Sequence, residues 1–190
     1  MSNIKLEKGV SIRLKKDSEL LKNVQCNLLW QIDDKHDVDV DVSCLGIAID
    51  DKGAESLYSE NYFVFYNNLE SGDGSILHTG DERVQGGESI IINLEKIPEG
   101  VVNIAMFITI HNATKKRQHF GLVDSATCQI MNEKTSEMIA EYDLKEDFKG
   151  MTAVHVGSFY RVDDEWEFKA LGAGMVADLG GILSHYGVNA

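Results

Sequence analysis

Apolar and polar residues alternate in short runs along most of this chain. Residues 10–14 follow a period of two, and valines at 38, 40 and 42 alternate with aspartates at 37, 39 and 41. Successive side chains of a strand point to opposite faces of a sheet, so these runs predict strands with one buried face. The run of valines continues through residues 45–49, and the same reasoning predicts strands at residues 24–32, 62–66, 89–92, 101–110, 121–131, 138–142, 151–162 and 165–171.

Turn residues separate the predicted strands. Gly, Asn and Asp fill the intervals, as in Asp50-Asp51-Lys52-Gly53, and these residues tolerate the positive φ that tight turns require. About ten short strands with such spacing are typical of an all-β sandwich or barrel. Only the C-terminal stretch changes period: its apolar residues recur at helical spacing, which predicts a short amphipathic helix over residues 174–187.

Composition agrees with a globular chain that folds as one domain. Hydrophobic residues make up 43% of the 190 residues and charged residues 26%, and no linker, repeat or change of composition divides the chain. The longest nearly uncharged apolar stretch, residues 104–110, is too short to cross a bilayer, and the first nine residues lack the apolar core of a secretory signal. We therefore expect a single domain over residues 1–190, located in the cytoplasm and without membrane insertion.

The three cysteines, Cys26, Cys44 and Cys128, are an odd number and have no CxxC-like spacing. This pattern does not suit a disulfide framework or a structural zinc site. Each cysteine lies in an apolar or alternating segment, so we expect buried free thiols, which suit a reducing compartment.

The charge of the chain restricts its function classes. Eighteen Lys and Arg residues against 31 Asp and Glu residues give a formal net charge of −13. Such a surface repels the phosphates of nucleic acids, and no basic stripe with interleaved aromatic residues overcomes that repulsion, so nucleic acid is not an expected partner. Excess carboxylate can serve as a solvated surface or can bind hard cations, and only the arrangement of the carboxylates distinguishes the two.

The segment from Asp37 to Ser43 carries the most specific chemistry. Asp37, Asp39 and Asp41 would share one face of a strand, about 7 Å apart, while the valines between them enter the core. Like charges at this spacing repel one another, and a Ca²⁺ ion, which takes six to eight oxygen ligands, would remove that cost. A solvated polar strand face explains this triplet, taken by itself, equally well.

Two glycine-containing loops favour the metal interpretation, because one strand cannot complete a calcium shell. Residues 67–74 offer amide oxygens and a carboxylate, residues 78–82 add two carboxylates, and a glutamate after Gly86-Gly87 would close the shell. The candidate ligands of these segments are Asn67, Asn68, Asp73, Asp81, Glu82 and Glu88. No helix flanks the aspartates and the 12-residue loop pattern is absent, so the site is not an EF-hand.

Several blocks of the sequence resemble one family. Residues 37–43 are similar to the DFDLDAS segment of the tellurium-resistance (TerD) family, residues 63–68 to its FVFYNN strand end, and residues 73–81 to its DGSV-HTGDN loop. Residues 158–161, 166–170 and 187–189 resemble its ELYR, WKFRA and FGVNV motifs in the same order. The likeness runs from Leu6 to the end of the chain.

The resemblance implies a two-sheet β-sandwich with calcium at one edge. It also implies a cytoplasmic protein that confers resistance to tellurite and other stress, without catalytic activity, in complexes with related proteins, some of them at the membrane. Two departures concern the metal: the acidic loop after Asp81 is shorter than in the family, and Asn112 stands where relatives often have aspartate. Both remove carboxylates, so we expect one calcium site to be retained and a second, present in many relatives, to be weakened.

The alternative is a metal-assisted enzyme or small-molecule-handling protein that acts on an anionic ligand. That alternative predicts a deep pocket with a general base beside the metal, whereas an interaction module predicts a shallow acidic edge. The chain has six histidines but no Gly-x-Ser-x-Gly elbow or similar nucleophile turn. His78 is expected in a turn or as a support of the metal ligands, and not as a ligand itself, because calcium prefers oxygen. We also expect no cluster of thiols that could reduce or sequester tellurite. We therefore predict a non-enzymatic interaction module.

Overall fold

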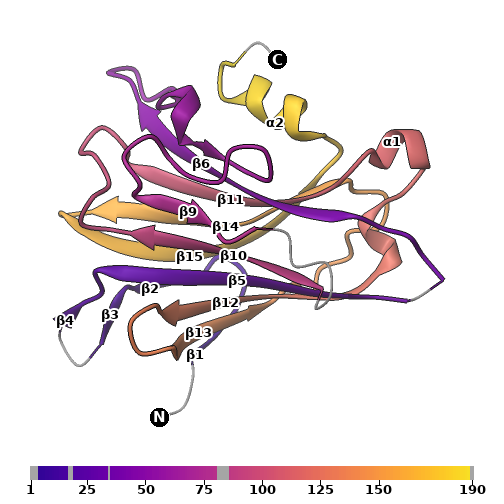
Figure 1. Cartoon of the computed structure of the whole chain (residues 1–190), viewed down its shortest axis with the longest axis horizontal. Helices are drawn as coiled ribbons and strands as arrows, with labels where there is room; N and C mark the ends of the chain where they lie inside the picture. Colours follow the sequence, from indigo (N-terminus) through magenta and orange to yellow (C-terminus); the bar gives the residue numbers. More distant parts are fainter. Residues whose placement is uncertain (1–3, 17–18, 34, 81–85, 189–190) are drawn as a thin grey trace.

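The computed structural model describes residues 4–16, 19–33, 35–80 and 86–188, and two β-sheets packed face to face make up most of it (Figure 1). The six-stranded sheet has the strand order β1-β13-β12-β5-β10-β9. The seven-stranded sheet has the order β2-β15-β14-β11-β6-β7, and β8 also pairs with β6. The predicted all-β sandwich of two sheets with a short C-terminal helix is confirmed.

The strands are short, as the sequence predicts. The six-stranded sheet contains β1 (Ile4–Leu6), β5 (Asn23–Ile32), β9 (Ile76–His78), β10 (Gly87–Asn93), β12 (Val123–Asn132) and β13 (Glu137–Asp143). The seven-stranded sheet contains β2 (Ser11–Arg13), β6 (Val40–Ile49), β7 (Glu55–Leu57), β8 (Phe63–Val64), β11 (Asn103–Ile110), β14 (Ala153–Val162) and β15 (Glu165–Met175). The ribbon of β3 (Lys15–Lys16) and β4 (Glu19–Leu20) and the helical segments η1 (Glu60–Tyr62), α1 (Ala113–Lys116), η2 (Phe120–Leu122) and α2 (Leu179–His185) complete the elements.

The main core lies between the sheets and is built from alternate residues of each strand. In β5, for example, Val24, Cys26 and Leu28 are buried while the residues between them are only partly buried. Strand β11 departs from alternation, because all eight of its residues are buried. Its second face packs under α2, in a separate cluster of buried apolar residues. Figure 1 shows α2 on the outer side of the seven-stranded sheet and α1 at one end of the sandwich.

The C-terminal helix begins later than the predicted residue 174. Met175 is still in β15, where it pairs with Ala153. Ala177 is held by the Thr152 hydroxyl, which donates to its carbonyl (2.7 Å) and accepts from its amide (3.0 Å). Asp178 then caps α2 by accepting from the amide of Gly181 (2.9 Å). The apolar residues at the start of the helical pattern therefore belong to a strand.

Two other predicted strand boundaries are wrong. The predicted strand at residues 62–66 contains only the two residues of β8, because a 3-10 turn precedes it and a turn follows it. The acidic run enters a strand only at Val40, which pairs with Ile110. Since β11 ends at Ile110, no partner strand extends to residues 37–39.

The prediction of buried free cysteines is confirmed, but the prediction that no thiols cluster is wrong. Cys26 and Cys128 lie on the neighbouring strands β5 and β12, with their sulfur atoms 3.5 Å apart. A hydrogen bond with Cys26, together with burial, raises the pKa of Cys128 well above its usual value. Both thiols are fully buried, so the pair offers no thiolate to a reagent in solvent.

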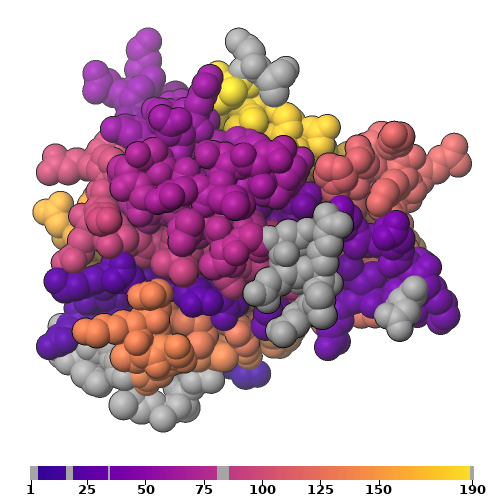
Figure 2. All heavy atoms as spheres, viewed as in Figure 1, coloured from indigo at the N-terminus to yellow at the C-terminus, as the bar shows by residue number. Residues whose placement is uncertain are grey.

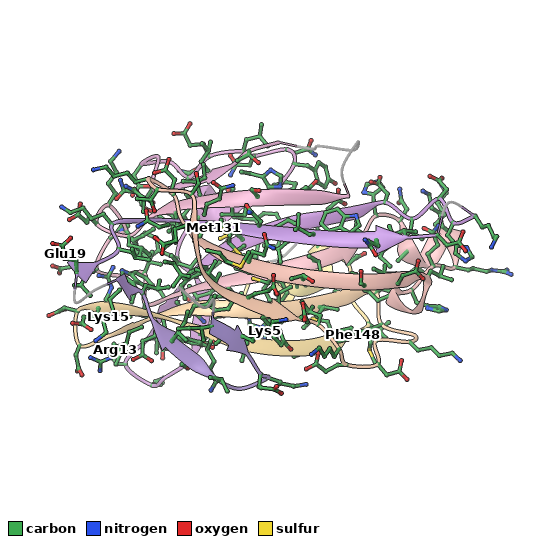
Figure 3. All side chains as sticks on the ribbon, turned by 90° about the horizontal axis from the view of Figure 1, so that it is seen from below. Lys5, Arg13, Lys15, Glu19, Met131 and Phe148 are labelled. Carbon is green, nitrogen blue, oxygen red and sulfur yellow. The ribbon has the colours of Figure 1, made fainter. Side chains whose placement is uncertain are left out.

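The two faces of the sandwich differ. Figure 3 shows the molecule from below. In this view Lys5 and Met131 lie over the six-stranded sheet, and none of the described helices covers this face. In Figure 2 the atoms of the segment from β7 to β9, coloured purple to magenta, fill the centre of the visible side. Within the described ranges, no helix is long and apolar enough to span a membrane.

Candidate functional site

Asp37, Asp39 and Asp41 form an acidic edge where the chain enters β6. Val40 and Val42 are buried at 4% and 0% exposure, so the predicted burial of these valines is confirmed. Asp41 lies between them and points to the opposite side, with its side chain 14% exposed. The side chain of Asp37 is fully exposed. The edge thus runs from solvent to a half-enclosed carboxylate.

The segment after β11 fixes the backbone of the acidic edge. The amide of His111 donates to the Asp39 carbonyl (2.8 Å), and the Gln118 side chain donates to the Asp37 carbonyl (2.6 Å). The ring nitrogen Nδ1 of His111 lies 3.5 Å from the Asp41 carboxylate, and Lys116 Nζ lies 3.6 Å from that of Asp37. These contacts hold the edge open to solvent on one side and border it with basic groups on the other.

The charges of two aspartates affect the pKa of the Tyr66 hydroxyl. Burial raises the pKa of its hydroxyl, and the negative charges of Asp41 and Asp39 raise it further. The Tyr66 ring also makes an edge contact with His111, at 5.9 Å between ring centres. Since two carboxylates act on one phenol, Asp39 and Asp41 lie close to the turn that carries Tyr66.

The turn after β8 brings the predicted asparagines to this end of the molecule. Phe65 and Asn68 exchange backbone hydrogen bonds around it (3.0 and 2.9 Å). The Asn68 side chain donates to the carbonyl of Phe63 (2.6 Å), so its amide group stabilises the turn. Asn67 is exposed at the tip, next to Tyr66.

A hollow of about 430 Å³ lies beside the acidic edge. Its walls come from the end of β11, from α1 and from the start of α2. Asp41, Tyr66 and His111 line one side, and Lys115 and Asp178 line others. The hollow therefore opens directly onto the half-enclosed carboxylate.

Asp73 serves its own loop. Its Oδ1 accepts from the Ser71 hydroxyl (2.9 Å) and from the hydroxyl and amide of Ser75 (2.7 and 3.0 Å), and Tyr62 donates to Oδ2. Burial acts to raise the pKa of Asp73, but these hydrogen bonds together lower it to about 2. With three donors on one oxygen, this carboxylate acts as a hydrogen-bond hub of the turn.

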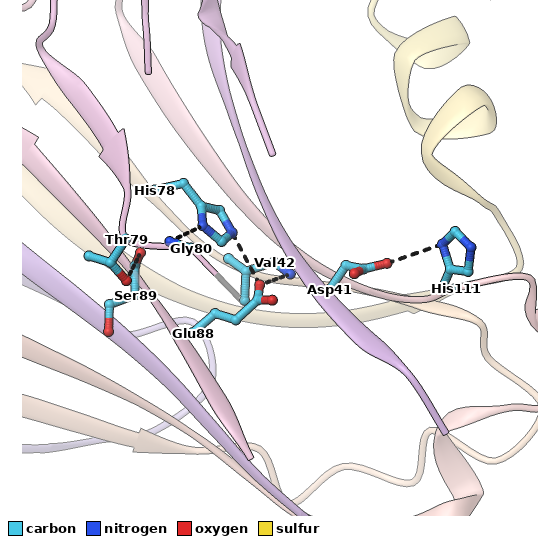
Figure 4. Close-up of polar contacts among 8 residues, drawn as sticks. All are labelled: Asp41, Val42, His78, Thr79, Gly80, Glu88, Ser89 and His111. Carbon is cyan, nitrogen blue, oxygen red and sulfur yellow. Dashed lines mark hydrogen bonds and ion pairs between the residues drawn. The ribbon is translucent and has the colours of Figure 1, made fainter. Parts of the chain in front are cut away.

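Glu88 and His78 form a buried pair between the sheets, with side chains 3% and 0% exposed. Glu88 Oε2 accepts from the Val42 amide (2.7 Å) and lies 3.1 Å from His78 Nε2. Figure 4 shows this pair on one side of β6, and Asp41 with His111 on the other. His78 is in strand β9, where its backbone pairs with Ile90 of β10, and not in a turn. The predicted alternative, a support of the metal ligands, stays a prediction.

The donor chemistry of the acidic edge fits calcium, since carboxylate and amide oxygens are its ligands. The described residues do not assemble a closed shell: within them, no three His, Cys, Asp or Glu side chains converge as a metal-binding group. Asp81 and Glu82 lie outside the described residues. The predicted ligand set does not include Tyr66 and His111, although Tyr66 lies within the FVFYNN block at residues 63–68 and His111 directly precedes Asn112.

Comparisons with known proteins identify the family of this chain. A family model described as the TerD domain matches residues 1–186. The chain is 38% identical over 194 residues to the tellurium resistance protein TerD of Serratia marcescens, with 99% of each chain covered. It is also 38% identical over 192 residues to general stress protein 16U of Bacillus subtilis (strain 168), with 97% of each covered.

A solved structure shows the same fold. The crystal structure of a homologue of telluride resistance protein (TerD) from Streptomyces coelicolor A3(2) superimposes with a TM-score of 0.63 at 19% sequence identity. The match covers 87% of this chain and 95% of that one. The similarity is therefore spread over the sandwich and is not confined to one motif.

Proposed function

The chain belongs to the TerD family, and on that basis we propose that it is a calcium-binding stress protein of the tellurite-resistance type. In this proposal the bound ion creates a surface for related stress-resistance proteins, and the chain is an interaction module without catalytic activity. The observation that carries the proposal is the acidic edge, where Asp37 is fully exposed and Asp41, next to His111, lines a hollow together with Tyr66.

Electrostatics explains why the edge favours a divalent cation. Asp37, Asp39 and Asp41 are separated by single residues, and the basic groups that border them, His111 and Lys116, make contacts of 3.5 Å or longer. The contact of the fully exposed Asp37 with Lys116 contributes little, because solvent screens it. A Ca²⁺ ion would neutralise two charges at once and would be bound by oxygen atoms, which it prefers.

The proposed ligand set is smaller than the set predicted from the sequence. Asp37, Asp39, Asp41 and Asn67 remain its centre, with Asp81 and Glu82 as further predicted ligands. Asn68, Asp73 and Glu88 use their polar groups within the protein, so we assign them to the support of the site. One retained calcium ion, with a second weakened by Asn112, follows from this count.

The setting of the edge supports partner binding. Asp37 is fully exposed, so an ion there would face solvent and a docking partner. We expect the partners to be related proteins, some of them in a complex at the membrane, and the location to be the cytoplasm. A nucleic acid is not an expected partner, because the net charge is −13.

The second candidate, a metal-assisted protein that handles an anionic small molecule, has one observation in its favour. The hollow of about 430 Å³ beside Asp41 is the size of small-ligand sites, and His111 lies where a general base would be needed. A ligand bound in this hollow should change the NMR signals of Tyr66 and His111. If a phosphate ester changes these signals only when calcium is present, the result would favour this candidate over a protein-binding module.

Calcium titration of the chelator-treated protein tests the proposal. We expect binding by calorimetry near one equivalent, selective over magnesium, and a stabilisation of roughly 2.7 kcal/mol at 100 times the dissociation constant. Asp39→Asn should remove most of this binding, because it takes a charged ligand from the edge. Asp163→Asn, a change in the β14–β15 turn, is the matched control and should bind as the wild type does. Tyr160 and Ile47 both pair with Asn103, so this turn lies at the Ile47 end of the sheet, away from Asp41.

Two results would contradict the proposal. Absence of both heat and thermal shift with calcium would leave the acidic edge as a solvated surface. Equal loss of binding in the two variants would mean that general negative charge, and not the edge, attracts the ion.

A further inference from the structure

Among the residues that the structure describes, strand β6 has a partner on only one side where it carries the acidic edge. On that side β11 pairs with it from Val40 to Ile47. On the other side β8 pairs only with Cys44 and Leu45, and β7 only from Ile47 onward. The amide of Val42 therefore lacks a strand acceptor, and a buried amide without an acceptor costs about 1–3 kcal/mol.

Glu88 supplies the missing acceptor from the opposite sheet. It belongs to β10 of the six-stranded sheet, and its Oε2 accepts from the Val42 amide at 2.7 Å. Glu88 is the one acidic residue among the buried polar residues that the structure describes. Burying a carboxylate is costly unless it is hydrogen-bonded, so this position is held by a specific contact and not by apolar packing.

His78 completes the contact and extends it to the next turn. Its Nδ1 accepts from the Gly80 amide (3.0 Å), so its proton is on Nε2, which donates to Glu88 Oε2 (3.1 Å). One oxygen atom thus accepts from both Val42 and His78. A continuous chain of hydrogen bonds runs from the Gly80 turn through β9 and β10 to β6, as Figure 4 shows.

We infer that His78 and Glu88 are positioning residues for the calcium site: they fix the strand that carries Asp41 and the turn at Gly80 relative to each other. This inference rests on the proposed function. Val42 follows Asp41 directly, so a shift of its amide moves the carboxylate on the other side of the strand. Glu88 therefore supports the ion through β6 and is not one of its ligands.

Two substitutions at Glu88 distinguish a positioning residue from a ligand. Glu88→Gln keeps one oxygen in place, and because a single oxygen accepts both hydrogen bonds, the amide can preserve them while the charge is lost. Glu88→Leu removes the acceptor altogether. We expect the calcium dissociation constant to rise about tenfold or more in Glu88→Leu, as for lost supporting contacts at other metal sites, and to stay within about threefold in Glu88→Gln.

A matched control separates positioning from general loss of stability. Ile92→Val is in the same strand, four residues from Glu88, at a fully buried position that pairs with Ile76 and not with His78, and should lower the melting temperature without weakening calcium binding. Hydrogen exchange of the Val42 amide in the metal-free protein gives a second readout. It should be faster in Glu88→Leu, and unchanged in Glu88→Gln and Ile92→Val after correction for global stability.

The calcium affinities of these variants test both the inference and the proposed function. If Glu88→Gln weakens binding as much as Glu88→Leu, Glu88 acts by charge or as a ligand and the inference is wrong. If neither change weakens binding, the inference is wrong while the calcium site stands. If the wild type itself binds no calcium, the proposed function fails, and the inference fails with it.

Discussion

His155 should make the stability of this protein depend on pH through one side chain. It lies in β14, stacks on Phe107 with ring centres 4.3 Å apart, and its Nε2 lies 2.9 Å from the hydroxyl of the fully buried Ser158. Burial lowers the pKa of His155 from 6.5 to about 4; a backbone hydrogen bond with Gly157 opposes this effect, and the charge of His185 adds to it.

The sign follows from proton linkage. The folded protein favours neutral His155, so between pH 6.5 and about 4 the unfolded chain binds more protons and stability falls as the pH falls. Integrated over that window, the loss is about 3 kcal/mol, of which roughly 2 kcal/mol is already lost at pH 5. Above pH 7 the side chain contributes no pH dependence.

Substitution by phenylalanine tests this magnitude. His155→Phe keeps an aromatic ring against Phe107 and removes the titration, although Ser158 then loses a partner at a pH-independent cost of about 1–3 kcal/mol. Urea unfolding of both proteins at pH 7 and pH 5 gives four free energies. The drop in stability from pH 7 to pH 5 should be about 2 kcal/mol larger in the wild type than in the variant.

An exposed histidine provides the comparison. His36→Gln, in an exposed segment, should retain the full pH dependence of the wild type. The reasoning is refuted if His155→Phe and the wild type lose the same free energy between pH 7 and pH 5. It is also refuted if His36→Gln removes the dependence, since the effect would then belong to the net charge.

Two further expectations concern the loop of Asp73 and Gly172, a glycine within strand β15. Asp73→Asn should lower the free energy of unfolding by about 1 kcal/mol at pH 7, a figure reduced for the exposure of this side chain. Because the pKa of Asp73 is lowered to about 2, this loss should shrink as the pH falls from about 3.8 toward 2. Equal differences in urea midpoint between wild type and variant at pH 7 and pH 2.5 would contradict the expectation. Gly172→Ala should destabilise by more than about 2 kcal/mol, because Gly172 has φ +51° and a methyl group there would collide with the Tyr142 hydroxyl. Gly53 has φ +82° and open space around it, so Gly53→Ala should cost only about 1 kcal/mol of stability, measured by denaturant titration. Equal losses of stability in Gly172→Ala and Gly53→Ala would contradict the collision with Tyr142.

Local periodicity determines one part of the fold. Alternation predicted the two-sheet class and the long strands β5, β6 and β14 to within three residues, because burial of one sheet face imposes a period of two on the sequence. It also placed Val40 and Val42 in the core and Asp41 on the other side of β6. These features depend on neighbours along the chain.

Partners from distant segments decided the rest. Met175 has the spacing of a helix residue, but it pairs with Ala153, so β15 extends and α2 starts at Leu179. Cys26 and Cys128 are 102 residues apart in sequence and come into contact only because β5 and β12 are neighbours. Neither fact has a local signal, since pairing between distant strands depends on the packing of the whole sheet.

The candidate site shows the same division. The aspartates at 37, 39 and 41 are visible as a motif, but a solvated strand face explains them equally well, and only the oxygen-rich loops nearby in the sequence favour the calcium prediction. The use of each remaining polar group depends on what lies opposite to it: Asp73 meets Tyr62, Ser71 and Ser75, and Glu88 meets an amide of the other sheet. A carboxylate binds whichever donor is nearest in space, so the sequence identified the oxygen atoms and the tertiary structure decided which of them face the edge.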